Sequence, residues 1–474
     1  MISLFEYQEE AVNDLRRSYA QGADAPLLVL PTGAGKTVCF TYMTQRAVAR
    51  SVRVLILVHR RELVNQVSEA LDKWGVRHGR IAPGSRQTND DVQIAMVQTL
   101  ARRVKMDRAG LYRFDLVILD EAHHAVKQST WGDVLKHNEG AKFLGVTATP
   151  CRLDGKGLGK GSGGFFDDMI IGPTVNELIQ LGRLVQPVVY APDKTVDLSG
   201  ISKRGGDYST KQLAGRMDDR SLTGDAVAHY RKLCGGSPAI AFTITREHAE
   251  HVAEDFKRGG YQWAVLSGET PDRERARMIR DLGTGSLHGI SSCNVVSEGT
   301  DIPGVTAAIL LRPTASLSLS IQQIGRALRS APGKEKAIIL DHAGNCHRHG
   351  LPTEEITWSL EGAKKSSKPI LAPCRSCGAL TQKRRGFCLT CVPAKASDDR
   401  PASDERQEEI AFTKPGELVE LTPSMRAAIK RKRLAEERLA ESSAELAAIG
   451  RARGYKYPEA WAKHRFQELK GVYQ

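Results

Sequence analysis

No run of apolar residues in this chain of 474 approaches the roughly 18 residues that a membrane-spanning helix needs. The first residues, MISLFEYQEE, contain no cationic stretch followed by an apolar one, which argues against a secretory signal. The five scattered cysteines, whose spacing suggests no disulfide framework, are Cys39, Cys151, Cys234, Cys293 and Cys346. These absences exclude a membrane protein and a small disulfide-stapled protein, and they predict a soluble, cytoplasmic protein.

A chain of this length is expected to form two or three globular units, each with its own core. Its 68 Lys and Arg outnumber its 55 Asp and Glu, so the formal net charge is +13. Much of the excess lies in residues 364–474, which contain 23 basic and 14 acidic residues. This bias suits a polyanionic partner such as nucleic acid, because each neutralised phosphate releases counterions. A solvated surface that keeps the protein soluble explains the charge equally well.

Two regions of the chain alternate short β-branched runs with helical patterns. In the first region the buried strands are predicted at LLVL, VRVLILV, VQIAMV, FDLVILD and AKFLGVTAT. After a polar, glycine-containing stretch the pattern resumes with AIAFTI, WAVLSG, GISSCNVV, TAAILLR and KAIILDHAG. This alternation is typical of βαβ units in a parallel sheet. We therefore predict two α/β domains with parallel sheets, at residues 1–190 and 226–362, joined by a connector at 191–225.

The composition changes after the second predicted domain. Four cysteines lie within residues 370–393. Residues 394–422 are acidic and polar with few aromatics, which is typical of a linker. Ala, Leu, Glu, Lys and Arg then dominate, so residues 423–474 are predicted to form a helical, basic tail.

A phosphate-binding loop is predicted at PTGAGKT, between the strand LLVL and a helix. Gly33 and Gly35 permit backbone conformations that turn N–H groups inward, Lys36 can reach the outer phosphates, and the Thr37 hydroxyl can bind Mg²⁺. Leu30 replaces the first glycine of the strict pattern, and a chance glycine-lysine turn is the alternative interpretation. The predicted ATP-binding residues of the loop are Thr32, Gly33, Ala34, Gly35, Lys36 and Thr37.

The strand FDLVIL runs directly into two carboxylates, Asp120 and Glu121, followed by Ala122 and His123. An acid at the carboxyl end of a parallel strand can hold Mg²⁺ opposite a phosphate loop. The next carboxylate can orient and deprotonate the attacking water. We therefore predict Asp120 as the metal ligand and Glu121 as the base, with an ordinary helix cap as the alternative.

These motifs, with later segments in the same order, resemble superfamily 2 helicases of the DEAD/DEAH type over roughly residues 3–350. VHRRELVNQ and VQTL resemble segments that contact the nucleic-acid backbone, and TATP resembles the segment that couples nucleotide state to domain movement. AIAFTITREHAEHVAEDF, SEGTDIPG and QQIGRALR resemble the motifs of the second domain. The resemblance implies two tandem RecA-like domains, with ATP and Mg²⁺ in the cleft between them and nucleic acid lying across both.

The resemblance also assigns roles to residues. Arg326 and Arg329 would reach the phosphates when the domains close, and Gln322 would position the water or the terminal phosphate. Gln8, in FEYQEEAV, would read the adenine edge. The catalytic set is therefore Lys36, Asp120, Glu121, Gln322, Arg326 and Arg329. The implied coupling residues are Thr147, Thr149 and Asp301, and the implied nucleic-acid contacts are Arg60, Arg61, Gln98, Thr99, Thr245 and Thr300.

The combination of DEAH, a following His124 and the ending GRALR resembles DNA-directed groups such as restriction-enzyme motors, XPB-like helicases and RadD-like DNA-repair helicases. The RadD-like group is resembled most, through DHAGNCHRHG, the cysteine cluster and the ending RGYKYPEAWAKHRFQELKG. This implies a helicase or translocase on single-stranded or forked DNA, with little sequence specificity, acting in repair, recombination or replication. A single-strand-binding or recombination protein is a candidate partner. An RNA helicase, or a DNA-binding remodeller or clamp that does not unwind, is the alternative.

The four clustered cysteines, Cys374, Cys377, Cys388 and Cys391, have the spacing C-x₂-C-x₁₀-C-x₂-C. Two such pairs can present four thiolates to Zn²⁺, and four protein ligands leave no open position for catalysis. We predict a structural zinc ribbon that binds DNA or a protein partner. An iron–sulfur cluster or a redox dithiol is the alternative.

Two further segments permit two interpretations each. Near the end of the chain the aromatics interleaved with basic residues are Tyr455, Tyr457, Trp461, His464 and Phe466. They suit stacking on unpaired bases, or Trp461 and Phe466 form the core of a helical hairpin that docks on the motor. The segment GKGLGKGSGG, at 155–164, predicts a flexible loop or a loop that faces nucleic acid through Lys156 and Lys160.

Overall fold

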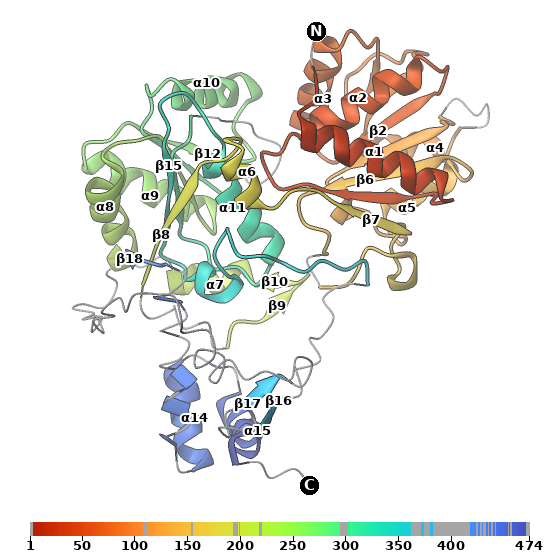
Figure 1. Ribbon diagram of the computed structural model, residues 1–474. Coiled ribbons are helices and arrows are strands. Elements are labelled where there is room, and N and C mark those ends of the chain that lie inside the picture. The colour runs from red at the N-terminus through yellow and green to blue at the C-terminus, as the bar shows by residue number, and fades with distance from the viewer. Residues whose placement is uncertain are drawn as a thin grey trace, which may run out of the picture.

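A computed structural model shows two α/β domains side by side, each built on a sheet of mainly parallel strands. A connector joins the two domains, and a helical C-terminal segment follows them (Figure 1). The structure describes residues 3–107, 112–152, 155–192, 198, 200–217, 220–293, 302, 304–361, 371–373, 380–382, 418–422 and parts of 425–470. None of the described helices is both long enough and apolar enough to cross a bilayer.

The first sheet has seven strands, all paired in parallel. In spatial order they are β3 (Gly79–Ile81), β4 (Val92–Met96), β2 (Val54–Val58), β5 (Leu116–Asp120), β6 (Lys142–Thr147), β1 (Pro26–Val29) and β7 (Asp168–Ile171). The helices of this domain are α1 (Glu6–Ala20), α2 (Lys36–Val48), α3 (Arg61–Lys73), α4 (Val97–Val104) and α5 (Thr130–His137). The parallel arrangement places every strand's carboxyl end at one edge of the sheet.

Both faces of the first sheet are buried. Leu28 and Ile56 belong to one apolar cluster, whereas their neighbours Leu27 and Leu55 belong to another on the opposite face. Successive side chains of a strand point to opposite faces, so a strand covered by helices on both sides must be apolar at every position. This explains why the predicted strands were continuous apolar runs rather than alternating ones.

The second sheet also has seven strands, six of them parallel. In spatial order they are β12 (Trp263–Leu266), β13 (Gly289–Ser292), β11 (Ala239–Phe242), β14 (Ala307–Leu310), β15 (Lys336–Asp341), β8 (Gln186–Pro192) and the antiparallel β18 (Leu418–Glu420). Its helices are α8 (Arg220–Cys234), α9 (Arg246–Arg258), α10 (Asp272–Gly283), α11 (Leu317–Leu328) and α12 (Asn345–His349). The ten strands predicted from apolar runs are all present in the two sheets.

The chain enters the second sheet earlier than predicted. After α6 (Val175–Gln180), β8 pairs in parallel with β15 of the second sheet, although most of β8 lies in the predicted first domain, 1–190. The predicted polar linker, 394–422, likewise ends in β18, which pairs with β8. Strand pairing over such distances depends on which sheet has a free edge, and local hydrophobic pattern contains no information about that.

The connector is structured where it is described. It forms a hairpin of β9 (Lys203–Arg204) and β10 (Asp207–Tyr208), followed by α7 (Thr210–Met217). Ile201 and Leu213 pack against Ile244 of the second domain, which holds the hairpin on that domain.

A strap, which we define as residues 350–361, runs from the second domain back to the first. The Gly159 N–H donates to the Leu360 carbonyl at 2.7 Å, and Trp358 and Leu360 pack against a core cluster of the first domain. A Cβ on Gly159 would lie 2.9 Å from the Leu360 carbonyl oxygen. The glycine-rich segment that predicted a flexible loop therefore forms a docking site for this strap.

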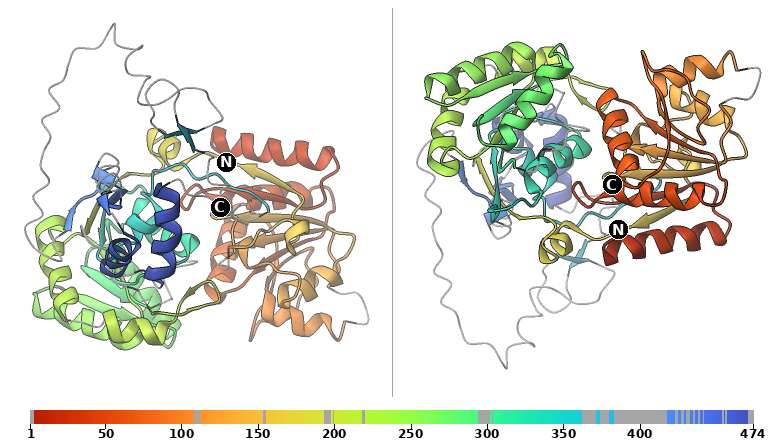
Figure 2. Two further views of the ribbon diagram at one scale, coloured as in Figure 1. Left: turned by 90° about the horizontal axis from the view of Figure 1, so that it is seen from below. Right: turned by 90° about the horizontal axis from the view of Figure 1, so that it is seen from above.

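The C-terminal segment includes α14 (Ser443–Ala452) and α15 (Pro458–Lys470), which pack against each other (Figures 1 and 2). Trp461 and Phe466 contribute to their shared apolar cluster, together with Leu446 and Ala462. The predicted docking of such a hairpin on the motor stays a prediction. The four cysteines predicted to bind zinc lie outside the described residues, which include the short antiparallel pair β16 (Leu371–Pro373) and β17 (Leu380–Gln382).

Candidate functional site

The predicted phosphate loop connects β1 to α2 with two glycines in left-handed backbone conformations. Gly33 has φ +90° and Gly35, the residue before α2, has φ +80°. A Cβ added at Gly33 would lie 2.8 Å from a methyl group of Leu184, and one added at Gly35 would clash with the Gln8 amide nitrogen. Both conformation and space therefore require glycine here, and the loop keeps its backbone next to the cavity described below.

Gln8 and Tyr7, in the first turn of α1, form hydrogen bonds with this loop. The Gln8 Nε2 and the Tyr7 hydroxyl each donate to the Ala34 carbonyl at 3.0 Å, and the Gln8 Oε1 accepts from the Phe5 N–H at 3.0 Å. Gln8 is 2% exposed and does not line the cavity. Its amide oxygen thus binds Phe5 and its amide nitrogen binds the loop, so the predicted contact with adenine would require it to exchange one of these partners.

The two predicted carboxylates come from the end of β5. Asp120 closes the strand, and Glu121 turns the chain in a left-handed conformation with φ +50° and ψ +50°. Such strain in a non-glycine residue is concentrated at functional sites. Burial and next the charge of Glu121 raise the pKa of Asp120 to about 7. Burial lowers the pKa of Lys36, opposed by Glu121 and Asp120, so these charges interact within one buried site.

Helix α11 of the second domain supplies the opposite wall. Gln322, Arg326 and Arg329 line a cavity of about 370 Å³ that also reaches Lys36, Thr37, Asp120 and Glu121. Gln322 is 3% exposed, and its Nε2 has no hydrogen-bond partner within the part of the chain that the structure describes. Leaving a buried amide N–H unpaired costs about 1–3 kcal/mol, and a phosphate oxygen or a water in the cavity would satisfy it.

The charge of the cavity suits a nucleotide. Four basic side chains, Lys36, Arg183, Arg326 and Arg329, and two acidic ones, Asp120 and Glu121, line it. The excess of two positive charges complements the doubly negative complex of Mg²⁺ with ATP. Burial lowers the pKa of Arg329 to about 10, so an anion in the cavity would relieve the cost of its charge.

Arg183 was missed by the sequence analysis. It lies in the connection between α6 and β8, with its guanidinium 3.4 Å from the centroid of the Phe5 ring. No local motif marks it, because it reaches the cavity only through the packing of that connection. Leu63 and Gln66 of α3 also line the cavity and were not assigned to it.

A chain of contacts connects the carboxylates to α11. His123 Nδ1 lies 3.1 Å from Thr147 Oγ1, and the Thr149 N–H donates to the same oxygen at 3.1 Å. The Thr149 hydroxyl is 2.5 Å from that of Ser318, in the first turn of α11. The predicted coupling residues Thr147 and Thr149 therefore join both walls of the cavity. The third, Asp301, lies outside the described residues.

The predicted nucleic-acid contacts lie at the carboxyl ends of strands. Arg60 and Arg61 follow β2 at the start of α3, and Gln98 and Thr99 follow β4 in the first turn of α4. Gln98 Nε2 donates to the His59 carbonyl at 3.3 Å, which joins the two positions. In the second domain Thr245 follows β11 and caps α9, accepting from the His248 N–H at 3.1 Å. The predicted contact Thr300 lies outside the described residues.

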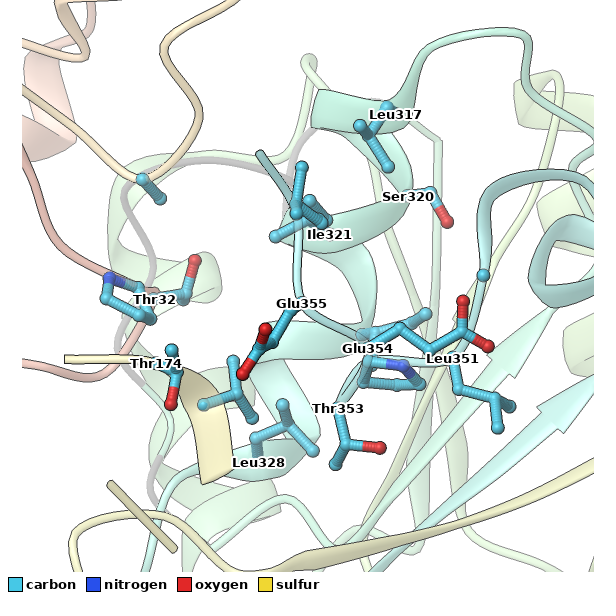
Figure 3. A pocket seen from close by; sticks show the side chains of 18 of the residues that line it. Thr32, Thr174, Leu317, Ser320, Ile321, Leu328, Leu351, Thr353, Glu354 and Glu355 are labelled. Atoms are coloured by element: carbon cyan, nitrogen blue, oxygen red, sulfur yellow. The ribbon is translucent and has the colours of Figure 1, made fainter. Parts of the chain in front are cut away.

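A second cavity, of about 130 Å³, lies between the domains against another face of α11 (Figure 3). Its lining is mostly apolar and includes Leu317, Ile321 and Leu328 of that helix. The carboxylates of Glu354 and Glu355 also line it, and they would repel a polyanion. The charged cavity is therefore the one suited to a nucleotide.

Two RecA-like sheets, with a phosphate loop and a carboxylate pair on one and arginines on the other, define a two-domain motor class. Family models agree: "Type III restriction enzyme, res subunit" matches residues 1–152, and "Helicase conserved C-terminal domain" matches residues 226–331. The chain belongs to the superfamily 2 helicases.

Several relatives give the extent of the similarity. A 51.5 kDa protein of a Lactococcus phage is 32% identical over 76% of this chain and 76% of its own length. IRC3 of Saccharomyces cerevisiae, named as a candidate ATP-dependent helicase, is 29% identical over 72% of this chain, which spans about half, 51%, of its length. Among solved structures, a candidate HsdR subunit of a type I restriction enzyme from Vibrio vulnificus has TM-score 0.56 at 19% identity, over 73% of this chain and 66% of that one.

Proposed function

We propose that this protein hydrolyses ATP in the charged cavity and uses the energy to move along DNA. The observation that carries the proposal is the convergence of Lys36, Asp120 and Glu121 with Gln322, Arg326 and Arg329 from the other domain. A site built from two domains changes shape whenever they move, so binding and hydrolysis can be converted into domain movement.

Each side chain has a proposed role. The loop backbone and Lys36 hold the phosphates, and Thr37 and Asp120 would hold Mg²⁺, which neutralises charge on the phosphate oxygens when bound. Glu121 takes a proton from the attacking water. Gln322 orients that water or the terminal phosphate, and Arg326 and Arg329 stabilise the negative charge that develops on the transferred group.

Coupling is proposed to follow the contacts from His123 through Thr147 and Thr149 to Ser318. Movement of Glu121 on hydrolysis would alter this route and shift α11, which also carries the arginines. Nucleic acid would lie along Arg60, Arg61, Gln98, Thr99 and Thr245, where contacts to the backbone give little sequence specificity.

DNA is proposed as the substrate, with unwinding or translocation as the output and repair, recombination or replication as the setting. Support comes from the resemblance to DNA-directed groups and from the match to a restriction-enzyme subunit, since restriction enzymes act on DNA. A single-strand-binding or recombination protein is the proposed partner.

The test is ATP hydrolysis in the presence of single-stranded DNA, duplex DNA or RNA, with Lys36→Ala and Glu121→Gln as inactive controls. Stimulation by DNA that both variants abolish is the expected result. Stronger stimulation by RNA would overturn the DNA assignment. Hydrolysis that no nucleic acid stimulates would contradict the motor itself. When DNA does stimulate hydrolysis, a strand-displacement assay separates unwinding from translocation.

We further propose that Cys374, Cys377, Cys388 and Cys391 bind one structural zinc ion. The support is their spacing, which suits a tetrahedral thiolate site. Metal analysis of the purified protein should find one zinc per chain, and Cys377→Ser should lower it. Iron and sulfide in place of zinc would instead indicate a cluster.

A further inference from the structure

The connector hairpin lies at the same edge of the second sheet as the predicted nucleic-acid contact Thr245. Gly205 and Gly206, with φ +61° and +90°, form its turn. Ile201 and Leu213 beside the hairpin pack on Ile244, the residue before Thr245. The hairpin therefore stands next to the carboxyl end of β11, outside the helicase motifs.

Asp207 fixes the hairpin in this position. Its carboxylate accepts from Arg312 Nη2 at 3.0 Å, from the Thr314 hydroxyl at 3.0 Å and from the Ala315 N–H at 2.7 Å. The Tyr208 N–H donates to it at 2.8 Å. This carboxylate thus accepts from an arginine and three further donors, and its charge is paired with that of Arg312.

Two of those cations meet at one aromatic ring. Lys203 Nζ lies 5.4 Å and the Arg348 guanidinium 5.7 Å from the centroid of Tyr208. Lys203 comes from the hairpin and is exposed, whereas Arg348 comes from α12 and is half-buried. Cations over an aromatic face are attracted by the ring, and here the ring gathers two charges from different parts of the chain.

A third basic side chain, His349, lies in the same cluster. Its Nε2 is 2.9 Å from the Thr314 carbonyl, to which Arg348 Nη1 also donates at 3.3 Å. Burial lowers the pKa of His349. The hydrogen bond with the Thr314 carbonyl and the charge of Asp207 oppose this shift, and the charges of Arg348 and Lys203 add to it.

We propose that the cluster of Lys203 and Arg348 on Tyr208 binds the sugar–phosphate backbone of DNA. It extends the proposed path of the DNA beyond Thr245. Bringing like charges together is unfavourable until an anion shares them, and a guanidinium suits phosphate oxygens well. The inference rests on the proposed function, since it extends the DNA path of the same motor.

The position of the hairpin gives this interaction a consequence. Thr314 and Ala315, which bind Asp207, immediately precede Ser316, the N-cap of α11. DNA bound to the hairpin would therefore act on α11, which carries Arg326 and ends just before Arg329. The cluster connects the bound DNA to the nucleotide cavity through the start of α11, a route separate from Thr147 and Thr149.

The test compares the wild-type full chain with the double variant Lys203→Glu, Arg348→Gln. Their affinities for single-stranded DNA are measured by fluorescence anisotropy over a range of salt concentrations. Binding should weaken roughly tenfold, and the slope of log affinity against log salt should fall by about 0.7 for each phosphate that the variant no longer neutralises. Hydrolysis of ATP without DNA should stay unchanged. Lys336→Glu is the control, because Lys336 is also exposed but begins β15, at the end of the sheet opposite to the carboxyl ends of the strands.

The outcomes separate this inference from the proposed function. If the wild type is stimulated by DNA and the double variant keeps the affinity and salt slope of the Lys336→Glu control, the cluster does not bind DNA. If the wild type neither binds DNA nor responds to it, the motor proposal fails first. Equal melting temperatures of the variants guard against misfolding, and Lys203→Ala provides a second, milder variant that should show the same direction of change.

Discussion

Glu62 of the first domain and Arg275 of the second form an ion pair across the interface between the domains. Glu62 lies in the first turn of α3, and Arg275, whose side chain is 11% exposed, lies in α10. The pair can form only when the two domains approach. It therefore stabilises the arrangement in which the arginines of α11 face the phosphate loop.

Breaking this pair should impair closure around ATP. We expect Glu62→Gln to cost about 1–2 kcal/mol, or roughly five- to thirtyfold in kcat/KM for ATP. The exchange Glu62→Arg with Arg275→Glu should recover part of the loss. Asp272→Asn is the control, because the Arg61–Asp272 pair spans 3.9 Å between exposed side chains and should contribute little. Purely additive effects in the double-variant cycle would show that the pair does not couple the domains.

His123 is expected to transmit nucleotide state rather than to bind ATP. It is 4% exposed and lies between Glu121 Oε2, 3.4 Å away, and Thr147 Oγ1. His123→Ala should leave nucleotide affinity nearly intact while lowering DNA-stimulated hydrolysis by roughly 2- to 30-fold. Nucleotide binding and stimulated turnover are measured on the same preparation. A variant with normal stimulation would exclude this route.

The strap should depend on the absence of a side chain at Gly159. Gly159→Ala places a Cβ 2.9 Å from the Leu360 carbonyl oxygen, so the strap must shift, at a cost of about 1–3 kcal/mol. Gly161→Ala is the matched control, because nothing lies within 4 Å of its added Cβ. Denaturant unfolding and limited proteolysis within 350–361 measure the effect. Equal behaviour of the two variants would contradict the docking of the strap on this segment.

Lys334 should give the protein a pH-dependent stability. Its Nζ donates to the carbonyls of Val305, Ala327 and Arg329 at 2.5–2.7 Å, which fixes the end of α11. Burial and next the charge of Arg329 lower its pKa from 10.5 to about 8. Between these values the unfolded chain holds a proton that the folded protein has released, so the free energy of unfolding rises with pH.

The variant Lys334→Met lacks this titration. Below about pH 8 the difference in unfolding free energy between wild type and variant should be constant, and above it the difference should increase in favour of the wild type. Denaturant unfolding of both proteins at several pH values measures it. A difference that stays flat up to pH 10.5 would show that Lys334 keeps its ordinary pKa.

The elements proposed to bind ATP could be located in the sequence because they are local. The phosphate loop needs a strand, two glycines and a helix start within a few residues, and the carboxylates need only the end of a strand. Strand order then brings the two together, since β6 alone separates β1 from β5. The roles of Gln322, Arg326 and Arg329 could be proposed because ordered motifs identify the second domain.

Arg183 and the connector could not be predicted in this way. Arg183 reaches the cavity only because β8 crosses into the second sheet, where its partner β15 begins at Lys336, far along the chain. The contact between Asp207 and Arg312 likewise joins residues 105 positions apart. Patterns of hydrophobicity and charge report on neighbours along the chain and not on such pairs.

The sequence by itself determined the two parallel-sheet domains, their order and the position of the proposed phosphate loop, because each depends on residues close together in the chain. The tertiary structure decided how those parts meet: that α11 faces the loop, that the strap returns to the glycine-rich segment, and that the hairpin stands beside Thr245. These arrangements arise from burying apolar faces and pairing charges between distant segments. The free energy of such contacts depends on the whole fold rather than on any one stretch of residues.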